Sequence, residues 1–367
     1  MSLMDGRRIL ISPLNWGLGH AGRMIPLAHE LRKRGHEIIF GADGSIIPAI
    51  EKDLPGIEII EIPGVRIRYS AALPQYISIL LQVPHIVTAS FREHSALKHL
   101  VRELKPDIII SDNRFGFFHK EIFSVFVTHQ LRILVPEWAK FAEPAAAWLN
   151  RKIISNFDLC LVPDYPGNVN LSGRLSHQLK LLDNIFYMGP LSRFSGISAG
   201  EAKTNLPHSY CCLILSGPEP QRSILFEKVS EALSGINLAV LCGSPAPGNT
   251  KTRGNITFIT DPDTATMKKV ISGSSLVISR AGYSSIIELV SLGRGGVIIP
   301  TPGQTEQEYL GQYHNGRHGF ITLKQNQLEH LREISPETQE AATPFSPETA
   351  PLQDEAFRLL LEQNKKS

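Results

Sequence analysis

Residues 277–312 read VISRAGYSSIIELVSLGRGGVIIPTPGQTEQEYLGQ, in which two apolar runs are separated by a glycine turn and a helical segment. The first run ends at Ser279, Gly282 follows in the turn, and Ser284 and Ser285 begin the helix. The N–H groups and the dipole of such a helix start form an anion site, which would hold a diphosphate. The pattern therefore predicts a strand, an anion-binding turn and a helix of an α/β domain.

Carboxylate and amide side chains follow this turn in an order that suits a nucleotide sugar. Glu288 lies about one turn inside the helix, where its carboxylate can accept hydrogen bonds from a ribose diol. The loop after the second apolar run carries Gln304, Glu306 and Gln307, whose side chains can bind sugar hydroxyls. The simpler alternatives are a solvated helix carboxylate and two glutamines that cap a loop. The segment thus predicts phosphate, ribose and hexose contacts in chain order.

Short apolar runs alternate with helical segments on both sides of this stretch. The runs are continuous, as in PDIIISD (106–112) and YCCLILSG (210–217), which is typical of strands buried on both faces of a parallel sheet. A chain of 367 residues also exceeds what one core usually holds. We therefore expect an α/β fold of two doubly wound, Rossmann-like domains that face a cleft. They span 4–195 and 205–335, and an exposed excursion and a carboxyl-terminal helix occupy 336–367.

Two stretches interrupt the alternation. The second half of residues 184–209, rich in Gly, Pro and Ser, is interpreted as the linker between the domains. Residues from about 325 to 354 are rich in Pro, Glu and Thr, which predicts exposed chain rather than core. The run EAFRLLLEQNKK (355–366) follows and predicts a short helix.

Composition restricts the partners and the compartment. The 37 Lys and Arg residues nearly cancel the 35 Asp and Glu residues, so no nucleic-acid partner is expected. The four cysteines show no CxxC spacing, which indicates a reducing cytoplasm. No apolar stretch reaches the ~18 residues of a transmembrane helix. Residues 73–87 and 136–154 place apolar and aromatic side chains beside Arg and Lys, which suits peripheral contact with the inner face of a membrane and equally suits ordinary core helices.

A second glycine pattern lies in RRILISPLNWGLGHAGRMIPLAHELRKRG (7–35). Gly17, Gly19 and Gly22 spell GxGxxG, the pattern of a dinucleotide-binding turn. That fingerprint starts directly after the strand, whereas here the residues PLNW intervene, and it has no need of the imidazole of His20. A histidine at a helix amino terminus has a lowered tendency to protonate, which suits a general base; a capping or packing histidine is the alternative.

Polar residues also follow two strands of the first predicted sheet. Asp112 ends the run at 106–112, and His129 and Gln130 end the next one, SVFVTHQ (124–130). Ligands of open parallel sheets lie beyond the carboxyl ends of the strands, so these residues are candidates for a binding site. Asp112 is a second candidate for the base, and a structural cap is the alternative for Asp112 and His129.

Residues 277–312 resemble the nucleotide-sugar motif of GT-B glycosyltransferases. The resemblance is strongest to the family 28-like enzymes that add N-acetylglucosamine to lipid-linked peptidoglycan precursors. GLGHAGRMIPLAHEL (17–31) is similar to the glycine loop and histidine motif of that family, and LILSGPEP (213–220) to the turn that opens its donor domain. The resemblance implies a nucleotide-sugar donor, a hydroxyl acceptor and no cofactor.

The resemblance also assigns roles to single residues. It implies that Glu288 binds the donor ribose and that His20 serves the acceptor side. We expect no metal site, because no His, Cys or Asp cluster has ligand spacing. The predicted catalytic residues are His20 and Asp112; the donor-binding residues are Gly217, Arg222, Gly282, Ser284, Ser285, Glu288, Gln304 and Gln307; the acceptor-binding residues are Gly19, His129 and Gln130.

These expectations together describe an inverting, metal-independent glycosyltransferase. It moves a hexose, with N-acetylglucosamine as one candidate, from a UDP-sugar to a hydroxyl acceptor, with a lipid-linked or cell-envelope glycan as a candidate. The run VTHQLRI (127–133) lacks the Glu and Asn of the His-Glu-Gln-Asn run in the peptidoglycan enzymes, so a different acceptor is expected. The alternatives are a non-hydrolysing nucleotide-sugar epimerase, a non-catalytic nucleotide-sugar-binding subunit and, least favoured, a dehydrogenase.

Overall fold

The structure is a computed structural model that describes residues 6–14, 18–44, 46–62, 75–195, 206–243, 250–334 and 349–362. The chain divides into two compact units. With the gaps just given, the first unit contains residues 6–62, 80–191 and 349–362, and the second contains residues 75–79 and 192–334. The linker predicted in the second half of residues 184–209 lies largely outside the described residues.

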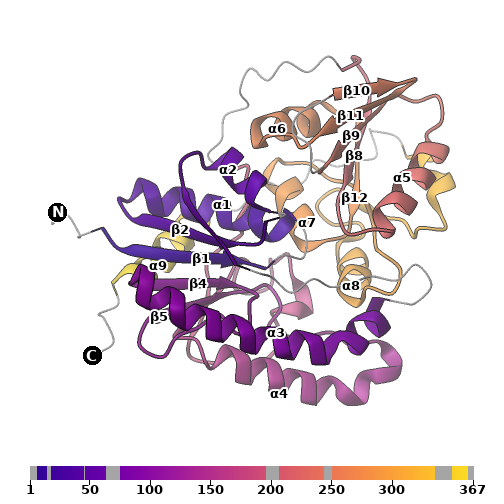
Figure 1. Ribbon diagram of the computed structural model, residues 1–367. Coiled ribbons are helices and arrows are strands. Elements are labelled where there is room, and N and C mark those ends of the chain that lie inside the picture. The colour runs from indigo at the N-terminus through magenta and orange to yellow at the C-terminus, as the bar shows by residue number, and fades with distance from the viewer. Residues whose placement is uncertain are drawn as a thin grey trace. The chain divides into compact units, whose positions relative to one another are not determined.

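A parallel sheet forms the centre of the first unit (Figure 1). Its strands lie in the order β3-β2-β1-β4-β5-β6-β7, and every described pair runs parallel. The order reverses between β1 and β4, and an open sheet binds its ligand at such a reversal. The strands are β1 (Arg8–Pro13), β2 (Glu37–Ala42), β3 (Glu58–Glu61), β4 (Ile108–Asp112), β5 (Phe123–Val127), β6 (Leu159–Val162) and β7 (Ile185–Tyr187).

Helices cover both faces of this sheet because side chains alternate along each strand. On β1, Ile9 and Ile11 pack in the core that contains α1, α2 and α9. Leu10 points to the opposite face and packs against α3, and α4 covers that same face over β5 and β6. The helices are α1 (Leu18–Lys33), α2 (Ile47–Asp53), α3 (Gln75–Leu104), α4 (Glu143–Ile154) and α9 (Thr349–Leu361), with 3-10 helices η1 (Glu137–Ala142) and η2 (Gly173–Leu175).

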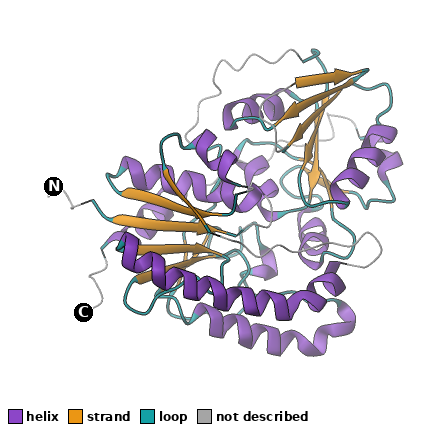
Figure 2. Ribbon diagram, viewed as in Figure 1, coloured by secondary structure: helices purple, strands orange, loops and turns teal. Residues whose placement is uncertain are grey.

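The second unit repeats this architecture (Figure 2). Its strand order is β10-β11-β9-β8-β12-β13-β14, parallel except for the β10–β11 pair, and it reverses between β8 and β12. Helices α5 and α6 lie on opposite faces of the sheet. The elements are β8 (Cys211–Leu215), α5 (Gln221–Ala232), β9 (Leu238–Cys242), β10 (Thr250–Arg253), β11 (Ile256–Thr260), α6 (Thr264–Gly273), β12 (Leu276–Arg280), α7 (Tyr283–Ser291), β13 (Gly296–Ile299), α8 (Thr305–His314), β14 (Phe320–Thr322) and η3 (Leu328–Glu333).

The predicted class, two doubly wound α/β sheets, is confirmed. The continuous apolar runs form the central strands, and strands β7, β10 and β14 at the sheet edges are additions that the sequence did not predict. Among the described residues, no helix has both the length and the apolarity needed to cross a membrane.

The expectation of exposed chain from about 325 to 354 is wrong at its start. Leu328 and Leu331 of η3 are buried in the core of the second unit. Their three-residue spacing places both on one side of a 3-10 turn, a pattern hidden among polar neighbours. Residues 335–348 lie outside the described residues.

Candidate functional site

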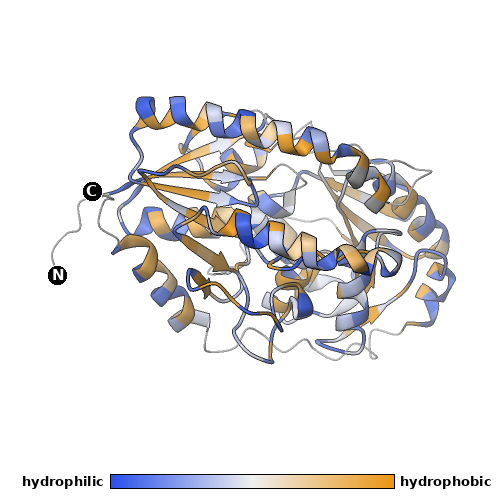
Figure 3. Ribbon diagram, turned by 90° about the horizontal axis from the view of Figure 1, so that it is seen from below, coloured by the Kyte–Doolittle hydropathy of each residue, from blue (hydrophilic) through white to orange (hydrophobic). Residues whose placement is uncertain are grey.

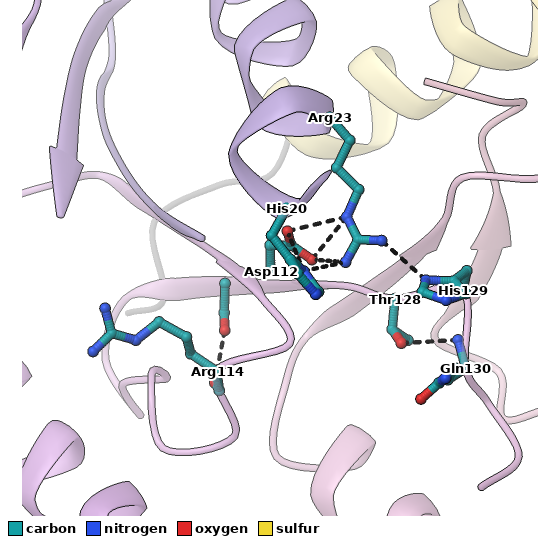
Figure 4. A network of polar contacts seen from close by, with 8 residues as sticks. His20, Arg23, Asp112, Arg114, Thr128, His129 and Gln130 are labelled. Carbon is teal, nitrogen blue, oxygen red and sulfur yellow. Dashed lines mark hydrogen bonds and ion pairs between the residues drawn. The ribbon is translucent and has the colours of Figure 1, made fainter. Parts of the chain in front are cut away.

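A network of buried polar side chains lies at the carboxyl end of β4, where the order of the first sheet reverses (Figure 4). Asp112, the last residue of β4, has no exposed surface, and its Oδ2 lies 3.0 Å from Nδ1 of His20. Nε of Arg23 donates to both carboxylate oxygens at 3.0 Å, and its Nη2 contacts Oδ1 as well. The side chain of His20 is 17% exposed, so His20 is the member of this network that solvent reaches.

The packing of α1 on the end of the sheet brings these groups together. His20 lies in the first turn of α1 and Arg23 lies three residues later, so both project from one side of the helix. Pro13 of β1 is paired with Asp112, and the N–H of Leu14 donates to the carbonyl oxygen of Asp112 at 3.0 Å. The end of β4 is thereby fixed beside the start of α1.

Two of the three opening glycines belong to α1. Gly19 and Gly22 lie in the first turns of α1, on either side of His20, and Gly17 lies outside the described residues. Helix α1 therefore presents an imidazole and a guanidinium to the sheet edge in addition to its glycines.

Burial decides the protonation of the pair formed by His20 and Asp112. Loss of hydration lowers the pKa of His20, which outweighs the raising effect of Asp112, and Arg23 lowers this pKa further. Burial alone would raise the pKa of Asp112, but Arg23 and His20 outweigh it and hold this pKa below its usual value. At neutral pH the pair is a neutral imidazole beside an ionised carboxylate.

Arg23 restricts the tautomer of His129, whereas Nδ1 of His20 has two competing partners, the donor Arg23 and the acceptor Asp112. Nη1 of Arg23 lies 2.9 Å from Nδ1 of His129 and can only donate, so His129 carries its proton on Nε2. Nδ1 of His20 lies within reach of Asp112 at 3.0 Å and of Nη2 of Arg23 at 2.8 Å. When Nδ1–H of His20 donates to Asp112, the lone pair is on Nε2, and Nε2 can take a proton from a bound hydroxyl.

The loop after β5 carries two of the three predicted acceptor residues, His129 and Gln130, and the third, Gly19, lies in α1. The N–H of Gln130 donates to Oγ1 of Thr128 at 3.0 Å, and Asn150 of α4 donates to the carbonyl oxygens of Gln130 and Leu131 at 3.0 and 2.8 Å. Figure 4 shows His129 turned toward Arg23 and Gln130 turned away from it. The structure thus brings His129 into the network and leaves Gln130 beside it.

A small pocket lies in the second unit at the carboxyl ends of β8, β12 and β13, where the order of that sheet reverses. Gly217 turns the chain after β8 with φ +94°, a conformation that L side chains rarely adopt. Gly282 directly precedes α7, and no side chain caps that helix start. The lining residues are Ser216, Gly217, Pro218, Gln221, Arg280, Gly282, Ser285, Thr301, Gln304 and Gln307.

Five of the predicted donor residues meet in this pocket, namely Gly217, Gly282, Ser285, Gln304 and Gln307. Oε1 of Gln307 accepts from the N–H of Thr301 at 2.9 Å. This side chain therefore also caps the loop, which was the alternative role considered for it in the sequence analysis. Ser284, in the first turn of α7, is not a lining residue.

Arg280 is the one charged residue among those that the structure describes around the pocket, and sequence reasoning missed it. It is 3% exposed, Nη2 donates to the carbonyl oxygen of Gln221 at 2.7 Å, and Nη1 donates to that of Pro300 at 3.4 Å. No carboxylate of the described residues pairs with it. Burial lowers its pKa to about 10, so it remains a cation at neutral pH. The available signal was a charged residue at the end of an otherwise apolar strand.

Besides Ser284, two more predicted donor residues, Glu288 and Arg222, lie outside the pocket lining. Glu288 is buried on α7, and its Oε1 accepts from Nε of Arg193 at 2.6 Å. Nε of Arg222 donates to the carboxylate of Glu219 at 2.8 Å, one turn of chain away. The pocket therefore draws its positive charge from Arg280 rather than from Arg222. Within the part of the chain that the structure describes, no group of three or more His, Cys, Asp or Glu could hold a metal ion.

Known proteins match both the sequence and the fold. The sequence model of the glycosyltransferase family 28 C-terminal domain matches residues 228–358. A protein of Methanosarcina mazei named "uncharacterized glycosyltransferase" is 28% identical over 325 residues, which are 82% of each chain. The chain is a GT-B glycosyltransferase that resembles family 28.

Other matches agree with this identification. The UDP-N-acetylglucosamine–N-acetylmuramyl-(pentapeptide) pyrophosphoryl-undecaprenol N-acetylglucosamine transferase of Lachnospira eligens is 28% identical to this glycosyltransferase over 295 residues, 77% of this chain and 75% of that one. A spinosyn rhamnosyltransferase solved with thymidine diphosphate superposes with a TM-score of 0.59 at 14% identity and covers 95% of this chain and 96% of its own. The glycosyltransferase of kitacinnamycin gives 0.58 at 16% identity, with 98% and 96% covered.

Proposed function

We propose that this glycosyltransferase moves a hexose from a UDP-sugar to a hydroxyl acceptor, with inversion at the anomeric carbon and without a metal ion. The observation that carries the proposal is the pair of His20 and Asp112. The imidazole is neutral and partly exposed, and its Nδ1 lies 3.0 Å from a buried carboxylate; with the proton on Nδ1 it has the arrangement of a general base. Such a base suits transfer to a hydroxyl, whose proton must be removed. A non-catalytic nucleotide-sugar-binding subunit, the alternative considered above, requires no base.

The donor belongs to the pocket of the second unit. Arg280, which has no carboxylate partner there, and the N–H groups at the start of α7 would bind the diphosphate and stabilise the charge that it gains as it leaves. Because this cation is a side chain of the pocket, the leaving group is stabilised without a metal. Oε2 of Glu288 would accept from the ribose, while Oε1 stays with Arg193. The name of the Lachnospira relative supports UDP as the nucleotide and N-acetylglucosamine as the sugar.

The transfer itself needs one proton to move. The acceptor oxygen attacks the anomeric carbon from the side opposite the diphosphate, its bond to carbon forms, and the bond from that carbon to the diphosphate oxygen breaks. The electron pair of the broken bond stays on the diphosphate, and Nε2 of His20 takes the proton of the acceptor hydroxyl. Asp112 stabilises the imidazolium that results, and proton removal of this kind contributes about 10²–10⁴-fold to a rate.

Titration calorimetry in EDTA tests the donor class. The wild type is titrated with UDP, thymidine diphosphate, UDP-N-acetylglucosamine, UDP-glucose, GDP-mannose and NAD. We expect UDP and a UDP-sugar to bind, Glu288→Gln to weaken both, and Glu227→Gln, which changes an exposed carboxylate of α5, to leave both unchanged. Binding of NAD without UDP would instead indicate a dinucleotide enzyme, and binding of thymidine diphosphate alone would overturn the choice of nucleotide.

An apolar surface of the first unit supports an acceptor carried by a membrane. It consists of exposed residues of α3, η1 and α4, among which Phe91 is 73% and Phe141 is 82% exposed. These elements lie on one side of the sheet, and Figure 3 shows that side with hydrophobic residues distributed along its helices. The remaining members are Leu81, Val83, Val87, Trp138, Trp148 and Leu149.

We infer that this α3–η1–α4 surface docks on the cytoplasmic face of the membrane and gives access to a lipid-linked precursor of a cell-envelope glycan. Exposed aromatic side chains gain free energy on entering the interface, and Arg92 and Lys152 beside them are exposed cations that attract anionic lipid. Burial of one large side chain contributes about 1.5–3 kcal/mol, so Phe91→Ser with Phe141→Ser should weaken binding at least about tenfold.

Co-sedimentation with vesicles of mixed neutral and anionic lipid tests this surface at low and high salt. The matched control is Val169→Ser, because Val169 is 74% exposed on the loop after β6. Binding that is lost in the double variant and kept in the control supports the surface. No binding of the wild type at either salt concentration points to an acceptor in solution.

A further inference from the structure

Gln221 carries a buried polar group for which the structure shows no partner. It is the first residue of α5 and lines the pocket of the second unit. Arg280 donates to its backbone carbonyl at 2.7 Å, which fixes the residue beside the cation. Its side-chain Oε1 is buried without a hydrogen-bond partner among the described residues. The terminal torsion of glutamine is broad, so Oε1 can turn into the pocket at small cost and regain a hydrogen bond from a ligand.

Helix α5 offers the pocket this side chain rather than backbone N–H groups. Pro218 and Pro220 have no N–H. The N–H of Arg222 donates to the carbonyl oxygen of Pro218 at 3.2 Å, and the N–H of Ser223 donates to the carboxylate of Glu219 at 3.1 Å. These two N–H groups of α5 are satisfied by neighbouring residues, so we place the diphosphate at the opposite wall, beside the arginine and the start of α7.

The chemistry of a nucleotide sugar restricts what can meet Oε1. The oxygens of an ionised diphosphate accept hydrogen bonds and have no proton to give. On the nucleoside side the diphosphate is joined to a CH₂ group. On the sugar side, the carbon next to the anomeric centre carries a hydroxyl or an acetamido group. This C2 substituent is the hydrogen-bond donor closest to the diphosphate.

We propose that Gln221 is a specificity-determining residue whose Oε1 accepts a hydrogen bond from the hydroxyl or amide N–H on C2 of the transferred sugar. The inference rests on the proposed function and deepens its donor site. Gln304 and Gln307 supply amides from the other wall of the pocket. Oε1 of Gln307 already accepts from the N–H of Thr301, whereas Oε1 of Gln221 has no partner among the described residues and can accept a hydrogen bond from the C2 substituent.

The test measures the affinity for three ligands in three proteins. The ligands are UDP, UDP-2-deoxyglucose, and whichever of UDP-glucose and UDP-N-acetylglucosamine binds the wild type more tightly. The proteins are the wild type, Gln221→Met, which keeps the length of the side chain and removes the amide, and Gln312→Met, the same change at an exposed position of α8. UDP reports whether the nucleotide part of the pocket is intact.

We expect the wild type and Gln312→Met to bind the parent sugar nucleotide about tenfold more tightly than the 2-deoxy compound. Gln221→Met should bind the two alike and bind UDP within twofold of the wild type. A preference for the C2 group that survives in Gln221→Met overturns the assignment, as does an equal loss of UDP affinity. A wild type that binds no UDP overturns the proposed function and this inference with it.

Discussion

Asp112→Asn separates a positioned general base from a histidine that only packs. The substitution keeps the size of the side chain and the hydrogen bonds that Arg23 donates to Oδ1, and it removes the negative charge. The amide N–H₂ of the asparagine then faces Nδ1 of His20, which favours the tautomer with the proton on Nε2. That tautomer has no lone pair for the acceptor hydroxyl.

The size of the effect follows from the geometry of the pair. The N–O contact of 3.0 Å places the two charge centres about 4 Å apart, where an effective dielectric constant of about 20 gives about 4 kcal/mol between them. The amide retains a neutral hydrogen bond worth about 1 kcal/mol. The remaining ~3 kcal/mol corresponds to about 10²-fold in kcat, and the wrong tautomer raises the expected loss toward 10⁴-fold.

The assay is UDP release at saturating donor, measured against pH. Asp107→Asn is the matched control, because Asp107 precedes the same strand at its other end and accepts from the N–H of Arg8 at 3.0 Å. Burial lowers the pKa of His20, so the acid limb of the wild-type profile should lie below pH ~6.5. Asp112 raises this pKa, and its removal should therefore move the limb to still lower pH.

Three results would refute this reasoning. A folded Asp112→Asn variant with kcat within threefold of the wild type would show that the carboxylate does not hold the base. An acid limb that moves to higher pH in this variant would show that the titrating group is not the His20 ring. A loss of activity shared by Asp107→Asn would trace the effect to the sheet rather than to the pair.

The remaining predictions concern the base and two of the buried arginines, Arg23 and Arg280. His20→Ala should lower kcat about 10²–10⁴-fold and leave UDP affinity within twofold, measured by UDP release and calorimetry. Arg23→Met should reduce the free energy of unfolding in urea by about 3–5 kcal/mol at pH 7, because Asp112 loses its buried cation. The pKa of that carboxylate is depressed in the folded wild type, so the difference should shrink as the pH falls below ~4. Arg280→Met should weaken UDP binding at least about tenfold, whereas Arg222→Met, which removes a residue paired outside the pocket, should change it less than about threefold.

The sequence predicts the centre of each sheet better than its edges. Central strands such as β4 and β12 are buried on both faces and leave continuous apolar runs, which a reader of the sequence can see. Strand β10 reads TKTR and is held by pairing with its neighbour, and β7 and β14 are three residues long. Nothing in such short or polar segments distinguishes them from loops until their partners are known.

In the candidate sites, too, the sequence predicts some residues and leaves their partners unpredicted. Asp112, Gly217 and Gly282 were predicted because the topology of a parallel sheet places strand ends and helix starts together whatever the side chains do. The partners of these residues depend on tertiary packing. In the sequence, Arg23 cannot be distinguished from the other charged residues of an amphipathic helix. Its contact with the carboxylate of Asp112 depends on how α1 packs against β4. Glu288 was predicted as a ribose ligand, but its contact with Arg193 depends on how the segment after β7 packs on α7.

The buried arginines of the two candidate sites, Arg23 and Arg280, explain why the units suit different ligands. In the first unit the charge of Arg23 is cancelled by Asp112, so the groups around His20 are neutral in sum and favour an uncharged hydroxyl. In the second unit Arg280 has only carbonyl oxygens as partners, so its pocket keeps a full positive charge and favours an anion. The difference lies in the last residue of the strand: β4 ends in the carboxylate of Asp112, whereas β12 ends in the cation of Arg280. A base that must stay neutral requires surroundings without net charge, whereas a pocket that binds a diphosphate requires a positive charge. The same type of doubly wound sheet provides both environments at its strand ends.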